Sequence, residues 1–235
     1  MNFYKMPDYE GVCRKTAGLI AAQIQIKPNS VIAMPTGSTP IGVFKKLVET
    51  YERGDLDFSE AVSFNLDEYL GVPQSAPQSF HTYMNHHLLD KVNISKDNCH
   101  FPDGCAEKID VECKRYEKLI ESCGGIDLMF LGIGSNGHIA FNEPEPVFSV
   151  STHVISLTEE SIRACAPAFE GQTVPTKAIS MGIKTIMMSK KIILAANGAA
   201  KKDIMRSALY GPITPSVPAS VLQLHHDLTV VWSDN

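Results

Sequence analysis

Residues 126–144 read Ile-Asp-Leu-Met-Phe-Leu-Gly-Ile-Gly-Ser-Asn-Gly-His-Ile-Ala-Phe-Asn-Glu-Pro, and this stretch decides the fold class. Its first eight residues form the most apolar short run of the chain, which predicts a fully buried strand. A strand that is apolar on both faces is typical of the middle of a parallel sheet covered by helices on both sides. We therefore expect the strand over 126–133 to form the centre of such a sheet, and a glycine-rich turn to follow it.

Apolar runs alternate with amphipathic stretches on both sides of this strand, which is the βαβ pattern of a parallel sheet. Further strands are predicted over 31–34, 61–66, 154–157, 191–196 and 228–232. Helices are predicted over 9–25, 40–52, 79–92, 106–122, 158–164 and 199–209. The segment 177–188 fits either a strand or a helix. Because no repeat, low-complexity tract or composition break interrupts the pattern, we expect residues 1–235 to form one domain of three α/β/α layers.

The composition suits a folded globular protein, with 44% hydrophobic and 20% charged residues in a chain of 235. Its 21 basic and 26 acidic residues give a net charge of −5. Nucleic acids and anionic membranes both require a basic surface, so neither is an expected partner. A small anionic ligand remains compatible with this charge, because a single loop can bind phosphate on an acidic protein.

The location expected from the sequence is the cytoplasm. The six cysteines include no Cys-x-x-Cys pair, and scattered thiols suit a reducing compartment. The N-terminus lacks the apolar segment of a secretory signal, and no apolar run reaches the ~18 residues of a membrane helix. The His-x-x-x-His spacing of many metal sites and the Gly-x-Ser-x-Gly turn of serine hydrolases are also absent, so neither chemistry is expected.

A polar loop connects the strand 31–34 to the next helix and is the first candidate for ligand binding. Its candidate residues are Thr36, Gly37, Ser38 and Thr39. Thr39 is expected to cap the helix, whose first turn contains Pro40. Free N–H groups, three hydroxyls and the helix dipole would favour an anion such as phosphate. An ordinary capped strand-to-helix turn uses the same residue types, and the loop matches neither the Walker nor the dinucleotide-binding pattern.

The second candidate is Asp67, which follows the strand 61–66 together with Glu68. Ligands of open α/β sheets gather at the carboxyl ends of the strands, where Asp67 is expected to lie. A carboxylate partly shielded from water there can remove a proton next to a carbonyl group. The alternative is that both carboxylates are solvated or cap a helix.

The turn after the central strand supplies the third group of candidates. Its closely spaced glycines allow positive φ angles and a close approach of backbone to ligand. His138 and Glu143 are five residues apart and can meet on a folded loop, where the carboxylate would orient the imidazole. With a reference pKa of about 6.5, an imidazole suits proton transfer near neutral pH. A buried structural histidine is the alternative. Lys201, near the start of the helix 199–209, is a further candidate because a lysine there opposes the helix dipole unless an anion is bound; the alternative is a solvated surface lysine.

Together these segments resemble the glucosamine-6-phosphate deaminase family. The resemblance rests on Pro-Thr-Gly-Ser-Thr-Pro at 35–40, Phe-Asn-Leu-Asp-Glu-Tyr at 64–69 and Asn-Gly-His-Ile-Ala-Phe-Asn-Glu-Pro at 136–144. It extends in family order through 174–176, 178–182 and 222–225. It implies a Rossmann-like α/β/α fold with a mostly parallel central sheet, and hydrolytic deamination of glucosamine 6-phosphate to fructose 6-phosphate and ammonia, a step of amino-sugar and N-acetylglucosamine catabolism.

The resemblance also implies a role for each candidate. His138, supported by Glu143 and Asn136, would move a proton during opening of the sugar ring. Asp67 would take the proton from C2 and return it at C1, giving an imine that water hydrolyses. The loop 36–39 and Lys201 would hold the phosphate. No metal or redox cofactor is expected for this chemistry.

Two departures from the family pattern carry further expectations. Some members have aspartate where this chain has Asn136, so Glu143 is expected to supply most of the negative charge beside His138. Large allosteric members have basic residues after the Glu-Pro step, whereas residues 145–153 contain no Arg or Lys. We therefore expect a monomer or low-order oligomer without activation by N-acetylglucosamine 6-phosphate. The segment 158–176 is expected to be a mobile lid.

Two other functions remain open on the sequence. A 6-phosphogluconolactonase-like sugar-phosphate hydrolase shares a glycine-rich loop with histidine and glutamate, but lactone hydrolysis requires no base at C2. The effector-binding module of a sugar-responsive regulator would carry a basic helix-turn-helix, which this sequence lacks.

Overall fold

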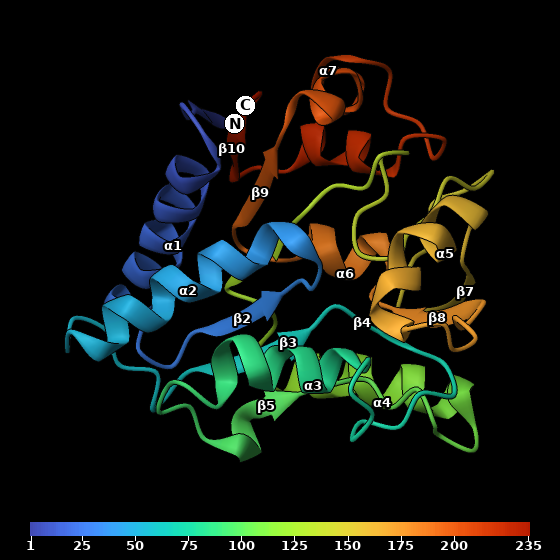
Figure 1. Cartoon of the computed structure of the whole chain (residues 1–235), viewed down its shortest axis with the longest axis horizontal. Helices are drawn as coiled ribbons and strands as arrows, with labels where there is room; N and C mark the ends of the chain where they lie inside the picture. The colour runs from blue at the N-terminus through green and yellow to red at the C-terminus, as the bar shows by residue number, and fades with distance from the viewer.

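A seven-stranded parallel sheet runs through the computed structural model, which describes all residues 1–235 (Figure 1). Its strand order is β1-β10-β9-β6-β2-β3-β5. The strands are β1 Asn2–Lys5, β10 Leu228–Ser233, β9 Ile192–Asn197, β6 Leu128–Leu131, β2 Val31–Met34, β3 Val62–Asn65 and β5 Cys99–His100. β6 is the fourth of the seven and all four of its residues are buried, which confirms the predicted central strand.

Helices cover both faces of this sheet. Strand alternation turns Ile32 and Met34 toward one face and Val31 and Ala33 toward the other, and each pair joins a separate apolar cluster of 25 or 26 buried residues. The first face carries α1 Tyr9–Ile26, α2 Ser38–Glu52, α3 Phe80–Met84 and the π-turn η1 Asn85–Leu89; the second carries α4 Ile109–Ser122, α6 Ile183–Met187, α7 Lys202–Tyr210 and the 3-10 segment η5 Pro218–Leu224. The predicted three-layer α/β/α class with a parallel central sheet is therefore confirmed.

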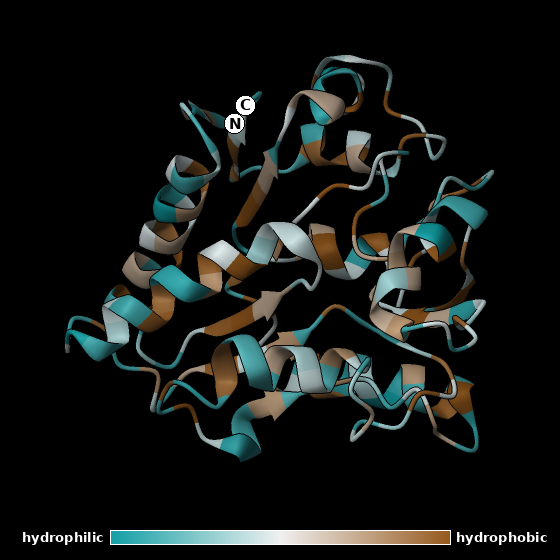
Figure 2. Ribbon diagram, in the orientation of Figure 1, coloured by the Kyte–Doolittle hydropathy of each residue, from teal (hydrophilic) through white to brown (hydrophobic).

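Hydropathy follows these layers: strands β2 and β9 are mostly hydrophobic, whereas α1 and α2 alternate hydrophobic and hydrophilic residues (Figure 2). The two chain termini lie close together, because β1 pairs with β10 at one edge of the sheet (Figure 1). None of the helices is both long enough and apolar enough to cross a membrane.

A smaller antiparallel sheet stands beside the main one, and the sequence patterns do not predict it. It has the order β4-β8-β7, from β4 Asp67–Tyr69, β8 Lys177–Ser180 and β7 His153–Ser156. With α5 Glu159–Cys165 and the 3-10 turn η3 Ala166–Phe169 it encloses a third, smaller apolar cluster. The segment 177–188 proves to contain both a strand and a helix, β8 and α6, which explains its mixed pattern.

The other differences from the predicted elements have local causes. β1 escapes prediction because its four residues are all exposed and carry no apolar alternation. The helix predicted over 79–92 ends at Leu89 after its last turn widens into η1, and the one predicted over 106–122 begins only at Ile109. The helix predicted over 199–209 opens with a 3-10 turn, η4 Ala199–Lys201; another short turn, η2 Lys96–Asn98, precedes β5.

Candidate active site

The candidate residues lie at one edge of the main sheet because their four strands are neighbours and run parallel. Strands β9, β6, β2 and β3 are adjacent, and Lys201, His138, the loop 36–39 and Asp67 respectively follow their carboxyl ends. The chain builds β3 and β5 on one side of β2 and then returns to build β6 on the other. Loops therefore diverge between β2 and β6, which is the topological switch point where α/β sheets bind ligands.

The loop after β2 opens α2 without a side-chain cap, so the predicted cap at Thr39 is wrong. Gly37 occupies the cap position with φ 102°, a left-handed conformation that favours glycine. Thr39 lies within the first turn, and its hydroxyl donates to Asn197 Oδ1 at 3.3 Å across the sheet edge. Pro40 lies in the first turn as expected. The N–H groups of Ser38 and Thr39, at the start of α2, consequently have no side-chain partner.

The loop after β6 wraps closely around His138. The Gly134 N–H donates to the His138 carbonyl at 2.9 Å, and a Cβ on Gly134 would lie 2.3–2.5 Å from three atoms of the imidazole ring. Gly137 has φ 89° and Ala140 has φ 49°, so the turn uses two left-handed residues. Only glycine fits at position 134, because any side chain would displace the imidazole.

Glu143 faces His138, as predicted from their spacing. His138 Nδ1 lies 3.4 Å from Glu143 Oε2, and the Glu143 side chain is only 2% exposed. Asn136 joins the two: its Nδ2 donates to Glu143 Oε2 at 2.7 Å, and its Oδ1 accepts from the His138 N–H at 3.1 Å. Nδ1 of His138 therefore faces the carboxylate at ion-pair distance without a hydrogen bond, and Nε2 lies on the opposite side of the ring.

Two hydroxyls that the sequence did not single out complete the surroundings of Glu143. Ser161 Oγ donates a short hydrogen bond to Glu143 Oε1, and Thr158 Oγ1 donates to the same oxygen at 3.3 Å. Thr158 also caps α5 by accepting from the Ser161 N–H at 3.2 Å. Each carboxylate oxygen thus has its own partners: Oε1 contacts the start of α5, and Oε2 contacts Asn136 and His138. The Thr-x-x-Ser capping pattern could have indicated the helix, but not its contact with Glu143.

The Glu143 carboxylate stays ionised over the whole working range. Burial by itself would raise its pKa, but the His138 ring and the donors Ser161 and Asn136 outweigh burial and hold the pKa at about 2. A buried, permanently ionised carboxylate beside the imidazole can orient the ring for proton transfer.

Asp67 is the first residue of β4 and pairs with Ser180 of β8, so the chain passes from the main sheet to the smaller one just before Asp67. It is 5% exposed, and its carboxylate accepts no hydrogen bond from the protein. Burial, followed by the nearby charge of Glu68, raises its pKa to about 8. A carboxylate with such a pKa is a far stronger base than an exposed aspartate.

The adjacent Glu68 has a different environment and a structural role. It is fully buried, and its carboxylate accepts the N–H groups of Tyr69 at 2.9 Å, Phe80 at 3.1 Å and His81 at 3.1 Å. Burial raises its pKa to about 7, and these three donors oppose the rise. Because Asp67 has no such donors, Glu68 carries the negative charge of the pair. The helix-capping alternative thus holds for Glu68, which caps the start of α3, and not for Asp67.

Lys201 stands at the opposite side of the site from Asp67, in the turn between β9 and α7. It is half-buried, and burial lowers its pKa while the carboxylate of Glu160 opposes this. Glu160 belongs to the first turn of α5 and accepts a short hydrogen bond from the Ser135 hydroxyl. A lysine at this edge of the sheet is suited to an anion, as is the start of α2.

Known proteins share much of this sequence. The model of the family of glucosamine-6-phosphate isomerases and 6-phosphogluconolactonases matches residues 9–232. The chain belongs to this family. It is 53% identical to the glucosamine-6-phosphate deaminase of Lachnoclostridium phytofermentans over 232 residues, which is 98% of both chains. It is 48% identical to that of Clostridium botulinum strain Kyoto, over 98% of this chain and 95% of the relative.

Solved structures extend the comparison to the whole fold. A monomeric glucosamine-6-phosphate deaminase superposes with a TM-score of 0.96 at 38% identity, covering 99% of this chain and 97% of its own. A 6-phosphogluconolactonase of Thermotoga maritima superposes with a TM-score of 0.79 at 20% identity, covering 100% and 99%. At that identity the lactonase shares the fold alone, so it is the deaminases that bear on the chemistry.

Proposed function

We propose that this chain is a glucosamine-6-phosphate deaminase, which converts glucosamine 6-phosphate and water to fructose 6-phosphate and ammonia. Full-length identity of 48–53% to named deaminases supports this activity. The observation that carries the chemistry is Asp67, a buried carboxylate without hydrogen-bond donors at the switch-point edge. Removing a proton from carbon requires such a base, whose raised pKa lies close to the working pH.

Ring opening is the first step in the proposed mechanism. His138 takes the proton of the anomeric hydroxyl and gives it to the ring oxygen, so that the C1–O5 bond breaks and C1 becomes an aldehyde. Its Nδ1 faces the Glu143 carboxylate at 3.4 Å and its backbone N–H donates to Asn136, so in this proposal Nε2 serves the substrate oxygens. The ionised Glu143 stabilises the transient imidazolium form.

Asp67 acts next, on the open chain. Its carboxylate takes the proton from C2 while the substrate's ammonium group gives a proton to O1, which produces an enolamine, and the resulting carboxylic acid then returns its proton to C1. C1 is then a CH2OH carbon and C2 an imine. Water adds to C2, the C–N bond breaks, and fructose 6-phosphate and ammonia leave. The atoms balance without an oxidant or reductant.

The phosphate is held away from the chemistry in this proposal. The loop 36–39 contributes the free N–H groups of α2 and its hydroxyls, and Lys201 contributes a positive charge. Binding energy gained there orients C1 and C2 between His138 and Asp67. We further propose that the protein works in the cytoplasm as a monomer or low-order oligomer, in line with its 38% identical monomeric relative.

The decisive experiment measures ammonia and fructose 6-phosphate formed from glucosamine 6-phosphate by wild type and Asp67→Asn. We expect turnover by the wild type and a loss of about 10²–10⁴-fold in the variant. Equal activity in the two proteins would remove Asp67 from its role, and an inactive wild type would overturn the function. Hydrolysis of 6-phosphogluconolactone, measured in parallel, should be absent.

The oligomeric state and regulation have their own test. Sedimentation velocity should give a particle of one or a few chains, and the rate curve should be hyperbolic. A sigmoidal curve that N-acetylglucosamine 6-phosphate converts to a hyperbola would contradict the proposed lack of regulation.

A further inference from the structure

Tyrosine hydroxyls contact the backbone of the loop 36–39 and the start of α2. Three consecutive carbonyl groups, those of Gly37, Ser38 and Thr39, accept hydrogen bonds from tyrosine hydroxyls. Tyr83 Oη donates to Gly37 O at 2.6 Å. Tyr9 Oη lies 3.2 Å from Ser38 O and 3.0 Å from Thr39 O. Neither tyrosine belongs to the loop: Tyr9 begins α1, and Tyr83 lies in α3.

The geometry of the peptide bond gives these contacts a consequence on the inner side. In a trans peptide the C=O of one residue and the N–H of the next point in opposite directions, and this chain has no cis peptide bond. When the carbonyl of Gly37 faces Tyr83, the N–H of Ser38 faces away from it. When the carbonyl of Ser38 faces Tyr9, the same holds for the N–H of Thr39. Holding the carbonyls therefore fixes the directions of two N–H donors.

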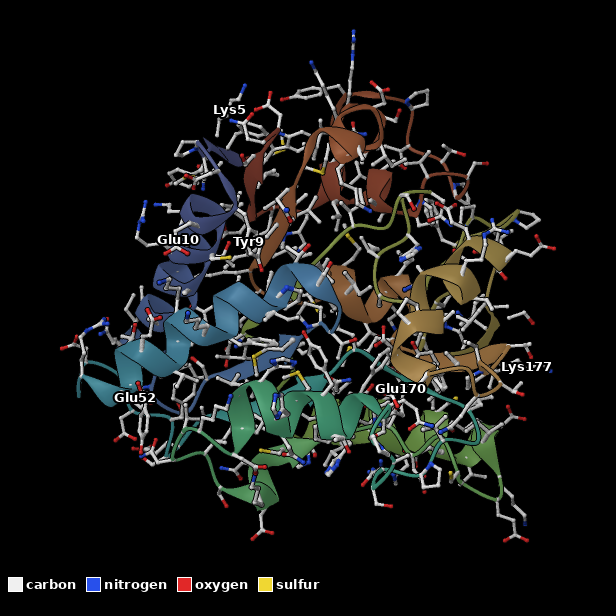
Figure 3. All side chains as sticks on the ribbon, viewed as in Figure 1. Lys5, Tyr9, Glu10, Glu52, Glu170 and Lys177 are labelled. Atoms are coloured by element: carbon white, nitrogen blue, oxygen red, sulfur yellow. The ribbon has the colours of Figure 1, made fainter.

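Tyr9, at the start of α1, also contacts the start of α2 through its hydroxyl. Besides donating to the loop carbonyls, its hydroxyl accepts the N–H of Gly42 at 3.0 Å, so it bridges the first turn of the helix. Figure 3 shows Tyr9 between α1 and the first turns of α2. A Cβ on residue 42 would lie 2.8 Å from this hydroxyl and 2.4 Å from Cys13 Sγ. Gly42 therefore leaves the space that admits the Tyr9 hydroxyl.

Tyr83 is held in place by its ring. It packs edge-on against Phe44 of α2 at a centroid distance of 6.5 Å and against His87 at 4.4 Å. Burial raises the pKa of Tyr9 to about 12 and that of Tyr83 still further above its ordinary value. Both hydroxyls therefore keep their protons and remain donors throughout the working range of pH.

We propose that Tyr83 and Tyr9 are positioning residues for the substrate phosphate, which hold the backbone of the loop 36–39 so that its N–H groups point at the anion. The inference rests on the proposed function, in which this loop binds phosphate. The effect belongs to binding rather than to the chemical steps, because the phosphate is remote from C1 and C2. Loss of a hydroxyl should therefore raise KM and leave kcat almost unchanged.

The test compares Tyr83→Phe, Tyr9→Phe and the double variant with wild type. KM and kcat are measured for glucosamine 6-phosphate, together with the inhibition constant of inorganic phosphate, which probes the loop directly. One hydrogen bond lost should raise both KM and this constant about threefold to tenfold, with kcat within about twofold. Tyr51→Phe is the matched control: Tyr51 lies on α2, packs on Phe58 and makes no hydroxyl hydrogen bond, so its values should not change.

The outcomes separate the inference from the function on which it rests. Inhibition of the wild type by phosphate, with unchanged constants in Tyr83→Phe and Tyr9→Phe, would overturn the positioning role alone. A fall in kcat at constant KM would do the same. A wild type that neither turns over glucosamine 6-phosphate nor responds to inorganic phosphate would overturn the proposed function first. Gly42→Ala, which keeps both hydroxyls but crowds that of Tyr9, should weaken phosphate inhibition in the same direction.

Discussion

A buried Asp67 carboxylate should lower the stability of the folded protein as pH rises, so removing its charge should stabilise the chain near and above neutral pH while strongly lowering activity. The perturbation is Asp67→Asn, which keeps the shape of the side chain. The carboxylate is 5% exposed and has no hydrogen-bond donor, and burial together with the Glu68 charge raises its pKa from 3.8 to about 8. A neutral amide at this position escapes the penalty for burying a charge.

The sign and size follow from proton linkage. Below about pH 4 the carboxyl is protonated in the folded and unfolded chains alike, so it does not lower the free energy of unfolding there. Between about pH 4 and pH 8 the unfolded chain ionises first, and folding stability falls by up to ~1.4 kcal/mol for each pH unit. Above pH 8 both states are ionised and the loss is constant. The amide of the variant cannot ionise, so the advantage of Asp67→Asn over wild type grows across this window, by up to ~4 kcal/mol between pH 5 and pH 8.

Urea unfolding of wild type and Asp67→Asn at pH 5, 6.5 and 8.5 measures this growth. Comparing the difference between the proteins across pH removes the pH-independent cost of burying an amide, about 1–3 kcal/mol. The surface variant Asp97→Asn is the control and should show no comparable growth. A difference for Asp67→Asn that is equal at pH 5 and pH 8.5 would refute the reasoning, because it would mean that the folded carboxylate is solvated.

Two further predictions concern the groups around His138. In Ser161→Ala, Glu143 Oε1 loses its short hydrogen bond and keeps only the longer one from Thr158, so kcat should fall about threefold to tenfold in steady-state assays, and Ser161→Thr should restore it. A kcat equal to wild type would dismiss this role. In Gly134→Ala the new methyl group occupies the space of the imidazole, so kcat should fall at least about tenfold. The control Gly132→Ala has open space at its Cβ and should leave kcat unchanged. Equal losses of kcat in both variants would contradict a specific effect on the imidazole.

The main sheet and its central strand could be predicted because they depend on local patterns. Four consecutive buried residues in β6 and in β2 are visible in the sequence as apolar runs. The smaller sheet could not be predicted in the same way. β4 has the residues Asp-Glu-Tyr, which show no strand pattern, and it forms only because residues more than a hundred positions later pair with it.

The capping of α2 shows the same limit at a single residue. Thr39 has the right chemistry for a cap, but Gly37 enters the helix with φ 102°, and the helix begins one residue earlier than Thr39. The Thr39 hydroxyl then reaches Asn197, 158 residues away. Local preference selected the residue type, and contact with a distant strand decided its partner.

The sequence by itself determined the residue types of the candidate site and their order, because the chemistry of a carboxylate or an imidazole belongs to the side chain. It also determined the parallel sheet, because apolar runs that alternate with amphipathic stretches predict buried strands connected by helices. The tertiary structure alone decided their environments. Asp67 and Glu68 are adjacent in sequence, yet Glu68 receives three N–H groups and Asp67 receives none. Burial and hydrogen bonding set the free energy of a charge, and both depend on segments that only folding brings together.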